Sequence, residues 1–106
     1  MIRVLIIDDE RLARAELRRL LVAHAEIEIV GEAANIEEAK RTIDDLQPEL
    51  IFLDVQMPGG SGFDLLASLD DAPEVIFTTA FDAYALKAFE VNALDYLQKP
   101  VAARRL

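Results

Sequence analysis

Short apolar runs alternate along this sequence with stretches of helical periodicity, and this alternation restricts the chain to very few folds. It is typical of βα repeats, in which each strand of a parallel sheet is followed by a helix. Several runs are apolar at every position, as strands that are buried on both faces require. We therefore expect an α/β fold. The runs predict five strands, over residues 3–7, 28–32, 50–53, 74–78 and 93–98.

The segments between the predicted strands favour helices. The first predicted helix spans residues 10–24. The second follows Asn35, a favourable N-cap residue, and stops at Pro48, while the third begins near Gly62 and ends before the next proline. In the first helix, the core-facing stripe consists of Ala13, Leu17, Leu20 and His24.

A fourth predicted helix, over residues 82–92, is apolar on more of its surface than one contact with a sheet needs. Its polar stripe is narrow and consists of Asp82, Lys87 and Glu90. Either this helix is deeply buried, or it presents an apolar surface to a partner beside the sheet edge. The final residues, 101–106, resemble the first turns of a fifth helix that is cut short.

Composition narrows the chemistry that the chain can perform. Its 106 residues suffice for one domain, and no apolar run approaches the roughly 20 residues that cross a bilayer, so we expect a soluble, cytoplasmic domain without membrane contact. There is no cysteine and His24 is the single histidine, so a metal would have to be held by oxygen atoms. A net charge of −9 argues against direct binding to nucleic acid.

Acidic, hydroxyl and basic side chains follow four of the predicted strands. Because ligands bind a parallel sheet at the carboxyl ends of its strands, these side chains should lie close together. Each of them alone has an ordinary explanation as a helix cap, part of a strand or a turn residue. Their joint occurrence at one edge of the sheet predicts a site. The residues are Asp8, Asp9, Asp54, Thr79 and Lys99.

The predicted site needs a cation, because carboxylates about 5 Å apart repel each other by roughly 3 kcal/mol at an effective dielectric of about 20. Mg²⁺ is suitable, since it prefers oxygen ligands and commonly combines one or two carboxylates with waters and a phosphate oxygen. With this ion and Lys99 nearby, the Asp54 carboxylate could attack a phosphorus atom. Thr79 and a main-chain amide, which we assign to Ala80, would then donate hydrogen bonds to the phosphoryl oxygens.

Four stretches of the sequence resemble motifs of response-regulator receiver domains, and the resemblance covers essentially the whole chain. They are IIDDE at residues 6–10, FLDVQMPGGSG at 52–62, TTA at 78–80 and DYLQKP at 95–100. The resemblance implies a flavodoxin-like, doubly wound fold with a five-stranded parallel sheet of order 2-1-3-4-5, helices on both faces and a truncated fifth helix. It also implies that a sensor histidine kinase or a small phosphodonor phosphorylates Asp54. The domain would catalyse only its own phosphorylation and dephosphorylation.

The same resemblance assigns a role to each residue of the metal site. Asp9 and Asp54 would bind Mg²⁺ directly, and Asp8 would act through a coordinated water. Gln56 would contribute its main-chain carbonyl. Lys99, together with Thr79, would hold the phosphoryl group.

A conformational switch is also implied by the resemblance. Thr79 and Tyr96 would move together and repack the face formed by the fourth helix, fifth strand and fifth helix, through which the chain could form a homodimer. Residues 77–100 resemble, more specifically, receivers of regulators that carry a LytTR-type DNA-binding output domain. We then expect residues 1–106 to be a receiver fragment whose output domain is missing. A further hypothesis is that bulky Phe81 shields the phosphorylated site from water.

Three other functions can be compared with this one. A haloacid-dehalogenase-like phosphatase uses similar groups, but it needs an acid two residues after the nucleophile, where Gln56 stands. A flavodoxin-like FMN-binding protein needs a Ser/Thr-rich phosphate loop after the first strand, where residues 10–12 read Glu-Arg-Leu. A pseudo-receiver would keep the fold as an interaction module without phosphorylation. The presence of all five expected site residues argues against that alternative.

Overall fold

The computed structural model describes residues 1–69, 71–79 and 95–99, without the side chains of Tyr96 and Gln98. The described helices and strands follow one another as expected for βα repeats, with one extra hairpin. In chain order they are β1 (Ile2–Ile7), α1 (Arg11–Leu21), β2 (Ile27–Ala33), α2 (Ile36–Leu46), β3 (Leu50–Asp54), β4 (Gln56–Met57), β5 (Gly60–Ser61), α3 (Gly62–Ala67), β6 (Glu74–Thr79) and β7 (Asp95–Gln98).

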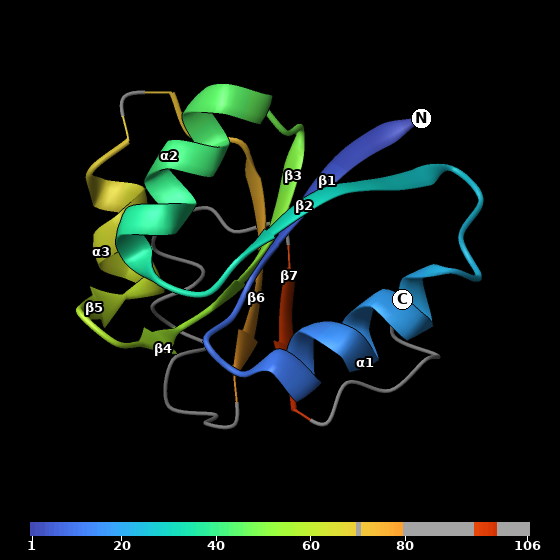
Figure 1. Cartoon of the computed structure of the whole chain (residues 1–106), viewed down its shortest axis with the longest axis horizontal. Coiled ribbons are helices and arrows are strands. Elements are labelled where there is room, and N and C mark those ends of the chain that lie inside the picture. Colours follow the sequence, from blue (N-terminus) through green and yellow to red (C-terminus); the bar gives the residue numbers. More distant parts are fainter. Residues whose placement is uncertain (70, 80–94, 100–106) are drawn as a thin grey trace.

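The main sheet of the described part of the chain has the strand order β2-β1-β3-β6-β7, and all of its strand pairs are parallel. Figure 1 shows α1 on one face of this sheet and α2 and α3 on the other. The predicted α/β fold with a parallel sheet is therefore confirmed. None of the helices in the described residues is long and apolar enough to cross a membrane.

Within the described residues, two apolar clusters form the core, one on each face of the sheet. Because successive strand residues point to opposite faces, Leu53 belongs to the cluster beneath α2 and α3, while Phe52 belongs to the cluster beneath α1. All five residues of β3 are buried. This explains why the β3 sequence is apolar up to its last residue, Asp54, whose carboxylate is consequently buried at the end of a central strand.

Helix α1 is shorter than predicted. It begins after the extended residue Glu10 and ends at Leu21. The amide of His24 donates to the carbonyl of Leu21 at 3.0 Å, which closes a tight turn and ends the helical stripe before His24. The prediction that His24 completes this stripe was wrong. The buried residues of the helix are Leu17, Leu20 and Leu21.

Helix α2 begins at the predicted cap. The side chain of Asn35 accepts a hydrogen bond from the Glu38 amide at 2.8 Å, and Glu38 in turn accepts one from the Ala34 amide at 3.1 Å. The helix ends at Leu46, and the C-cap residue Gln47 has a left-handed backbone (φ 48°) and precedes Pro48. Both boundaries therefore follow from local sequence, since the cap satisfies free amides and the proline prevents continuation.

Two predicted helices cannot be assessed. The predicted helix over residues 82–92 and the predicted start of a fifth helix at 101–106 lie outside the described residues. The hairpin formed by β4 and β5 was not predicted, because its strands have two residues each and the sequence between Asp54 and Gly62 carries no apolar alternation. This hairpin lies directly beside the carboxyl ends of the central strands (Figure 1).

Candidate functional site

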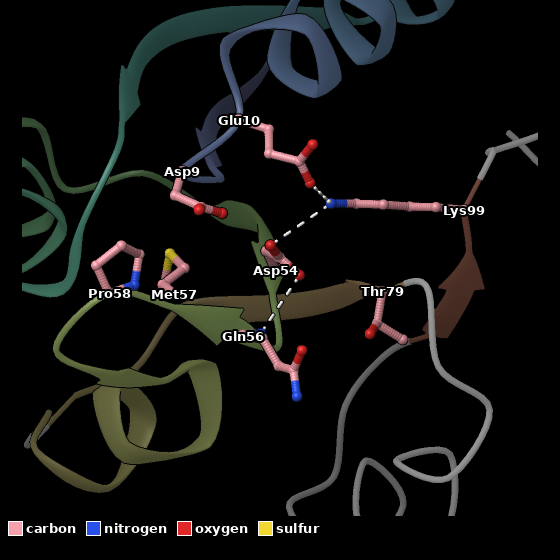
Figure 2. Close-up of a pocket in the computed structure, with 8 residues that line it drawn as sticks. All are labelled: Asp9, Glu10, Asp54, Gln56, Met57, Pro58, Thr79 and Lys99. Atoms are coloured by element: carbon pink, nitrogen blue, oxygen red, sulfur yellow. Dashed lines mark hydrogen bonds and ion pairs between the residues drawn. The ribbon is translucent and has the colours of Figure 1, made fainter.

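The predicted site residues meet at the carboxyl edge of the sheet. Asp54 ends β3, Thr79 ends β6 and Lys99 follows β7, and the parallel register brings these strand ends into line. They line a pocket of about 350 Å³, drawn in Figure 2. The residues that line it are Asp9, Glu10, Asp54, Gln56, Met57, Pro58, Thr79 and Lys99.

Lys99 reaches across this pocket toward three carboxylates. Its Nζ lies 2.7 Å from Oδ2 of Asp8, 3.5 Å from Oδ2 of Asp54 and 3.8 Å from Oε1 of Glu10. Burial alone would lower the pKa of Lys99, but the hydrogen bond to Asp8 and the negative charges of Asp54 and Glu10 outweigh it and raise this pKa. Lys99 is therefore a permanently charged ammonium group between the two buried acids.

Asp54 is held in an environment that disfavours its charge. Its exposed fraction is only 5%. Burial, followed by the negative charge of Asp8, raises the pKa of Asp54 to about 6, and Lys99 and the Gln56 amide oppose this shift only in part. The Gln56 amide donates to Oδ1 of Asp54 at 3.4 Å. The site thus holds more negative charge than Lys99 can neutralise, which favours binding of a further cation.

The acidic loop after β1 supplies the other carboxylates. Asp8 is 4% exposed, whereas Asp9 and Glu10 are exposed. Ligand oxygens of these three residues all lie within 4.8 Å of one another. Oδ1 of Asp8 accepts the Glu10 amide at 2.9 Å, which turns the loop at the start of α1. The loop therefore presents the two exposed carboxylates of Asp9 and Glu10 to the pocket, while the buried carboxylate of Asp8 contacts Lys99 at its edge.

Oxygen donors of this kind suit Mg²⁺. The ion tolerates few protein ligands, keeps several waters and needs open space for them, and the pocket has room beside the exposed carboxylates. The residues present therefore fit a hard divalent cation. Glu10 lines the pocket and was not predicted as a site residue, although its position directly after Asp8 and Asp9 was a usable signal.

Gly62 positions the hairpin against the end of β3. Its amide donates to the carbonyl of Val55 at 2.7 Å. A Cβ atom at this position would lie 2.6 Å from the main-chain oxygen of Asp54, closer than real contacts allow. The preceding residue, Ser61, forms a reciprocal capping box with Asp64 and so fixes the start of α3. The backbone of Asp54 is thereby packed directly against the first residue of α3.

The structure brings together Asp8, Asp9, Asp54, Gln56, Thr79 and Lys99 at one edge, as the sequence predicted. Thr79 is 1% exposed, and its carbonyl accepts the Lys99 amide at 2.7 Å. The predicted contributions of Ala80 and Phe81 lie outside the described residues. The main chain of Tyr96 pairs with Phe77 within the sheet, but its side chain is outside the described part, so the switch stays a prediction.

Fold and pocket together define a class of protein: α/β domains with a buried aspartate, a lysine and an acidic loop at the carboxyl edge of a parallel sheet. The family model for the response regulator receiver domain matches residues 4–106. The chain therefore belongs to this family, the receiver domains of two-component response regulators, and is a signalling module of the kind that in general binds Mg²⁺. This membership excludes the phosphatase and FMN-binding alternatives.

Relatives and solved structures agree with this assignment. The chain is 53% identical over 108 residues to an uncharacterized response regulatory protein of Vibrio cholerae, covering 100% of the chain and 46% of that protein. It is 53% identical to the transcriptional regulatory protein BtsR of Salmonella typhimurium, covering 100% and 45% respectively. The chain thus spans about half the length of these curated relatives.

Among solved structures, the response regulatory domain of protein mrkE from Klebsiella pneumoniae superposes with a TM-score of 0.87 at 33% identity, covering 98% of this chain and 88% of that one. The response regulator domain of Thermotoga maritima CheB gives a TM-score of 0.84 at 27% identity, with coverages of 97% and 81%. Both are named as response regulatory or response regulator domains.

Proposed function

We propose that this chain is a phosphorylatable receiver in which Asp54 accepts a phosphoryl group in the presence of Mg²⁺. The donor is a sensor histidine kinase or a small phosphodonor. The observation that carries this proposal is the position of the Asp54 carboxylate. It is buried at the pocket, 3.5 Å from the Lys99 ammonium group and opposite the acidic loop (Figure 2).

The chain's own residues divide the chemistry among them. An Asp54 oxygen attacks the phosphorus of the donor, a P–O bond forms, and the bond from phosphorus to the donor's leaving group breaks. Asp9 and Asp54 would hold Mg²⁺ directly, with Asp8 through a water and Gln56 through its main-chain carbonyl. When bound, the ion neutralises charge on the phosphoryl oxygens.

Asp54 must be ionised to attack. Because burial raises its pKa to about 6, the carboxyl is mostly ionised at pH 7.5 even without metal, and a bound cation would favour ionisation further. Lys99, which already lies between Asp8 and Asp54, would bind the new phosphoryl oxygens. Thr79 and the amide of Ala80 would donate the other hydrogen bonds.

Phosphorylation would act on the rest of the protein through a shift of population. The bound phosphoryl group favours the state in which Thr79 and Lys99 reach it, and Tyr96 follows, which repacks the face of the fourth helix, fifth strand and fifth helix. This face would also serve for homodimerisation. The relatives named as transcriptional regulators are about twice as long as this chain, which supports an output domain beyond the receiver. Our proposal gives that output domain the LytTR type and the DNA-binding role, and gives the protein a cytoplasmic location.

Intact-mass spectrometry tests this function. The chain is incubated with acetyl phosphate, with Mg²⁺ or with a chelator, alongside Asp54→Asn and the exposed control Asp45→Asn. One phosphoryl-sized mass increase should appear in the wild type and in the control, only with Mg²⁺, and not in Asp54→Asn. If circular dichroism shows a folded chain but no adduct forms under any condition, the pseudo-receiver alternative replaces this proposal.

A further inference from the structure

Arg14 connects three separate parts of the fold near the acidic loop. It lies in the first turns of α1, and its side chain is 16% exposed. Its Nη1 donates to the main-chain oxygen of Asp8 at 2.7 Å, and its Nε donates to Oε1 of Glu32 at 2.9 Å. One guanidinium group thus joins α1, the residue after β1 and the end of β2.

The Asp8 carbonyl is a sensitive point of attachment. It belongs to the peptide that joins Asp8 to Asp9, where the chain leaves the sheet and enters the acidic loop. Asp8 is otherwise held by its amide, which donates to Ala33 at 3.0 Å, and by its carboxylate, which accepts from Glu10 and Lys99. The hydrogen bond from Arg14 therefore fixes the plane of the Asp8–Asp9 peptide, and with it the position from which the Asp9 side chain extends.

Glu32 holds Arg14 in this position. Its second oxygen, Oε2, accepts a hydrogen bond from Nε of Arg18 at 2.8 Å, so each carboxylate oxygen is bound by a different arginine of α1. Burial would raise the pKa of Glu32, but hydrogen bonds and charges of Arg18 and Arg14 lower it. Glu32 therefore stays ionised near neutral pH and anchors the guanidinium fork.

We propose that Arg14 is a positioning residue for the magnesium site: anchored by Glu32, it fixes the Asp8–Asp9 peptide and thereby sets the Mg²⁺ affinity of the acidic loop. This inference rests on the proposed function, because it takes Asp8, Asp9 and Asp54 as the residues that bind the ion. The inference adds Arg14, which lies outside the pocket, to the residues that shape the site. Arg14 acts through the main-chain oxygen of Asp8, and not through the carboxylates that would bind the ion or through the phosphoryl group.

For a replacement of Arg14, a positioning role and a purely electrostatic role predict opposite changes in Mg²⁺ affinity. Arg14 is a cation near a cation site, so removal of its charge alone would raise Mg²⁺ affinity. Loss of the hydrogen bonds from Arg14 to Glu32 and to the Asp8 carbonyl would lower the Mg²⁺ affinity, because supporting contacts of this kind commonly contribute about tenfold or more in metal affinity. Lysine separates the two effects, since it keeps the charge but cannot donate to Glu32 and to the Asp8 carbonyl in the same fork geometry.

The test is calorimetric titration of Mg²⁺ alone into the full chain and its variants at pH 7.5. The variants are Arg14→Lys, Arg14→Gln and Glu32→Asp, which keeps the anchoring charge but shortens the side chain. Arg19→Gln is the matched control, because Arg19 lies on the same helix and pairs only with exposed Glu16 among its described ion pairs. Urea unfolding with a chelator gives each variant's folded fraction, and only data from folded protein are compared.

Positioning predicts that Arg14→Lys, Arg14→Gln and Glu32→Asp each bind Mg²⁺ about tenfold more weakly, whereas Arg19→Gln binds as the wild type does. The inference is overturned if Arg14→Lys and Glu32→Asp keep the wild-type affinity, or if Arg14→Gln binds more tightly. If Arg14→Lys does not fold, Glu32→Asp alone decides. Wild-type titrations that show no Mg²⁺ binding, or binding that survives Asp9→Asn, refute the magnesium site itself and this inference with it.

Discussion

The raised pKa of Asp54 has a consequence for stability in the absence of metal. A carboxyl group whose pKa is higher in the folded state binds its proton more tightly there than in the unfolded chain, so its ionisation at neutral pH destabilises the fold. Asp54→Asn removes this ionisation and keeps the shape of the side chain. We therefore expect the variant to be more stable than the wild type at pH 7.5 when a chelator is present.

The size of this gain follows from the two pKa values. The difference between the ordinary value of 3.8 and about 6 in the folded protein corresponds to at most about 3 kcal/mol. The gain should shrink on acidification, because the wild-type carboxyl becomes protonated in the folded state as pH falls through 6. Between pH 7.5 and pH 5, the advantage of Asp54→Asn should fall by about 1.4 kcal/mol.

Urea unfolding followed by circular dichroism at both pH values measures this difference. Asp45→Asn, on the exposed face of α2, is the control and should leave the free energy of unfolding nearly unchanged at both pH values. Added Mg²⁺ should stabilise the wild type and have little effect on Asp54→Asn, since ligands stabilise the state that binds them. A variant that is less stable than the wild type at pH 7.5, or a gain independent of pH, would refute the reasoning.

Three further predictions concern the packing around the site. Gly62→Ala should lower the free energy of unfolding by about 1–3 kcal/mol, because its Cβ would collide with the Asp54 carbonyl, and urea unfolding measures this. Asn35→Ala should cost about 1 kcal/mol in the same assay through loss of the helix cap, whereas Asn35→Ser should restore most of it. The ion pairs of Glu32 should contribute about 1 kcal/mol or less at pH 7. This contribution should begin to decrease below the ordinary pKa of 4.5 and be lost as pH falls through the lowered pKa that Glu32 has in the folded state. An unfolding difference between the wild type and Glu32→Gln that does not decrease as pH falls from 7 to 3 would contradict the last prediction.

The parallel α/β architecture could be predicted from the sequence because its strands are short apolar runs and its helices have strong local signals. Asn35 and Pro48 define the ends of α2 through contacts within the helix itself. The convergence of Asp8, Asp54 and Lys99 could be predicted as well, because parallel strands place their carboxyl ends together whatever the details of packing.

Features that depend on distant contacts could not be predicted. Helix α1 ends at Leu21 because a tight turn forms there, although apolar periodicity continues to His24. The bond from Arg14 to the Asp8 carbonyl joins a helix to a loop, and no pattern in the sequence reports it. The need for glycine at position 62 was also not predicted. It arises because the main-chain oxygen of Asp54 leaves no space for a Cβ atom there, and not from the backbone angles of Gly62 itself.

The close packing of Gly62 against the Asp54 carbonyl also bears on how this domain tolerates mutation. Gly59, whose positive φ of 86° has open space around it, should accept asparagine better than other residues, because asparagine adopts that backbone conformation most readily. At position 62 every replacement adds at least one carbon atom, and each would displace the main chain that carries the buried carboxylate. In a scan of all single substitutions we expect position 62 to be as restrictive for phosphorylation as the acidic positions themselves, although glycine contributes no side chain to the chemistry.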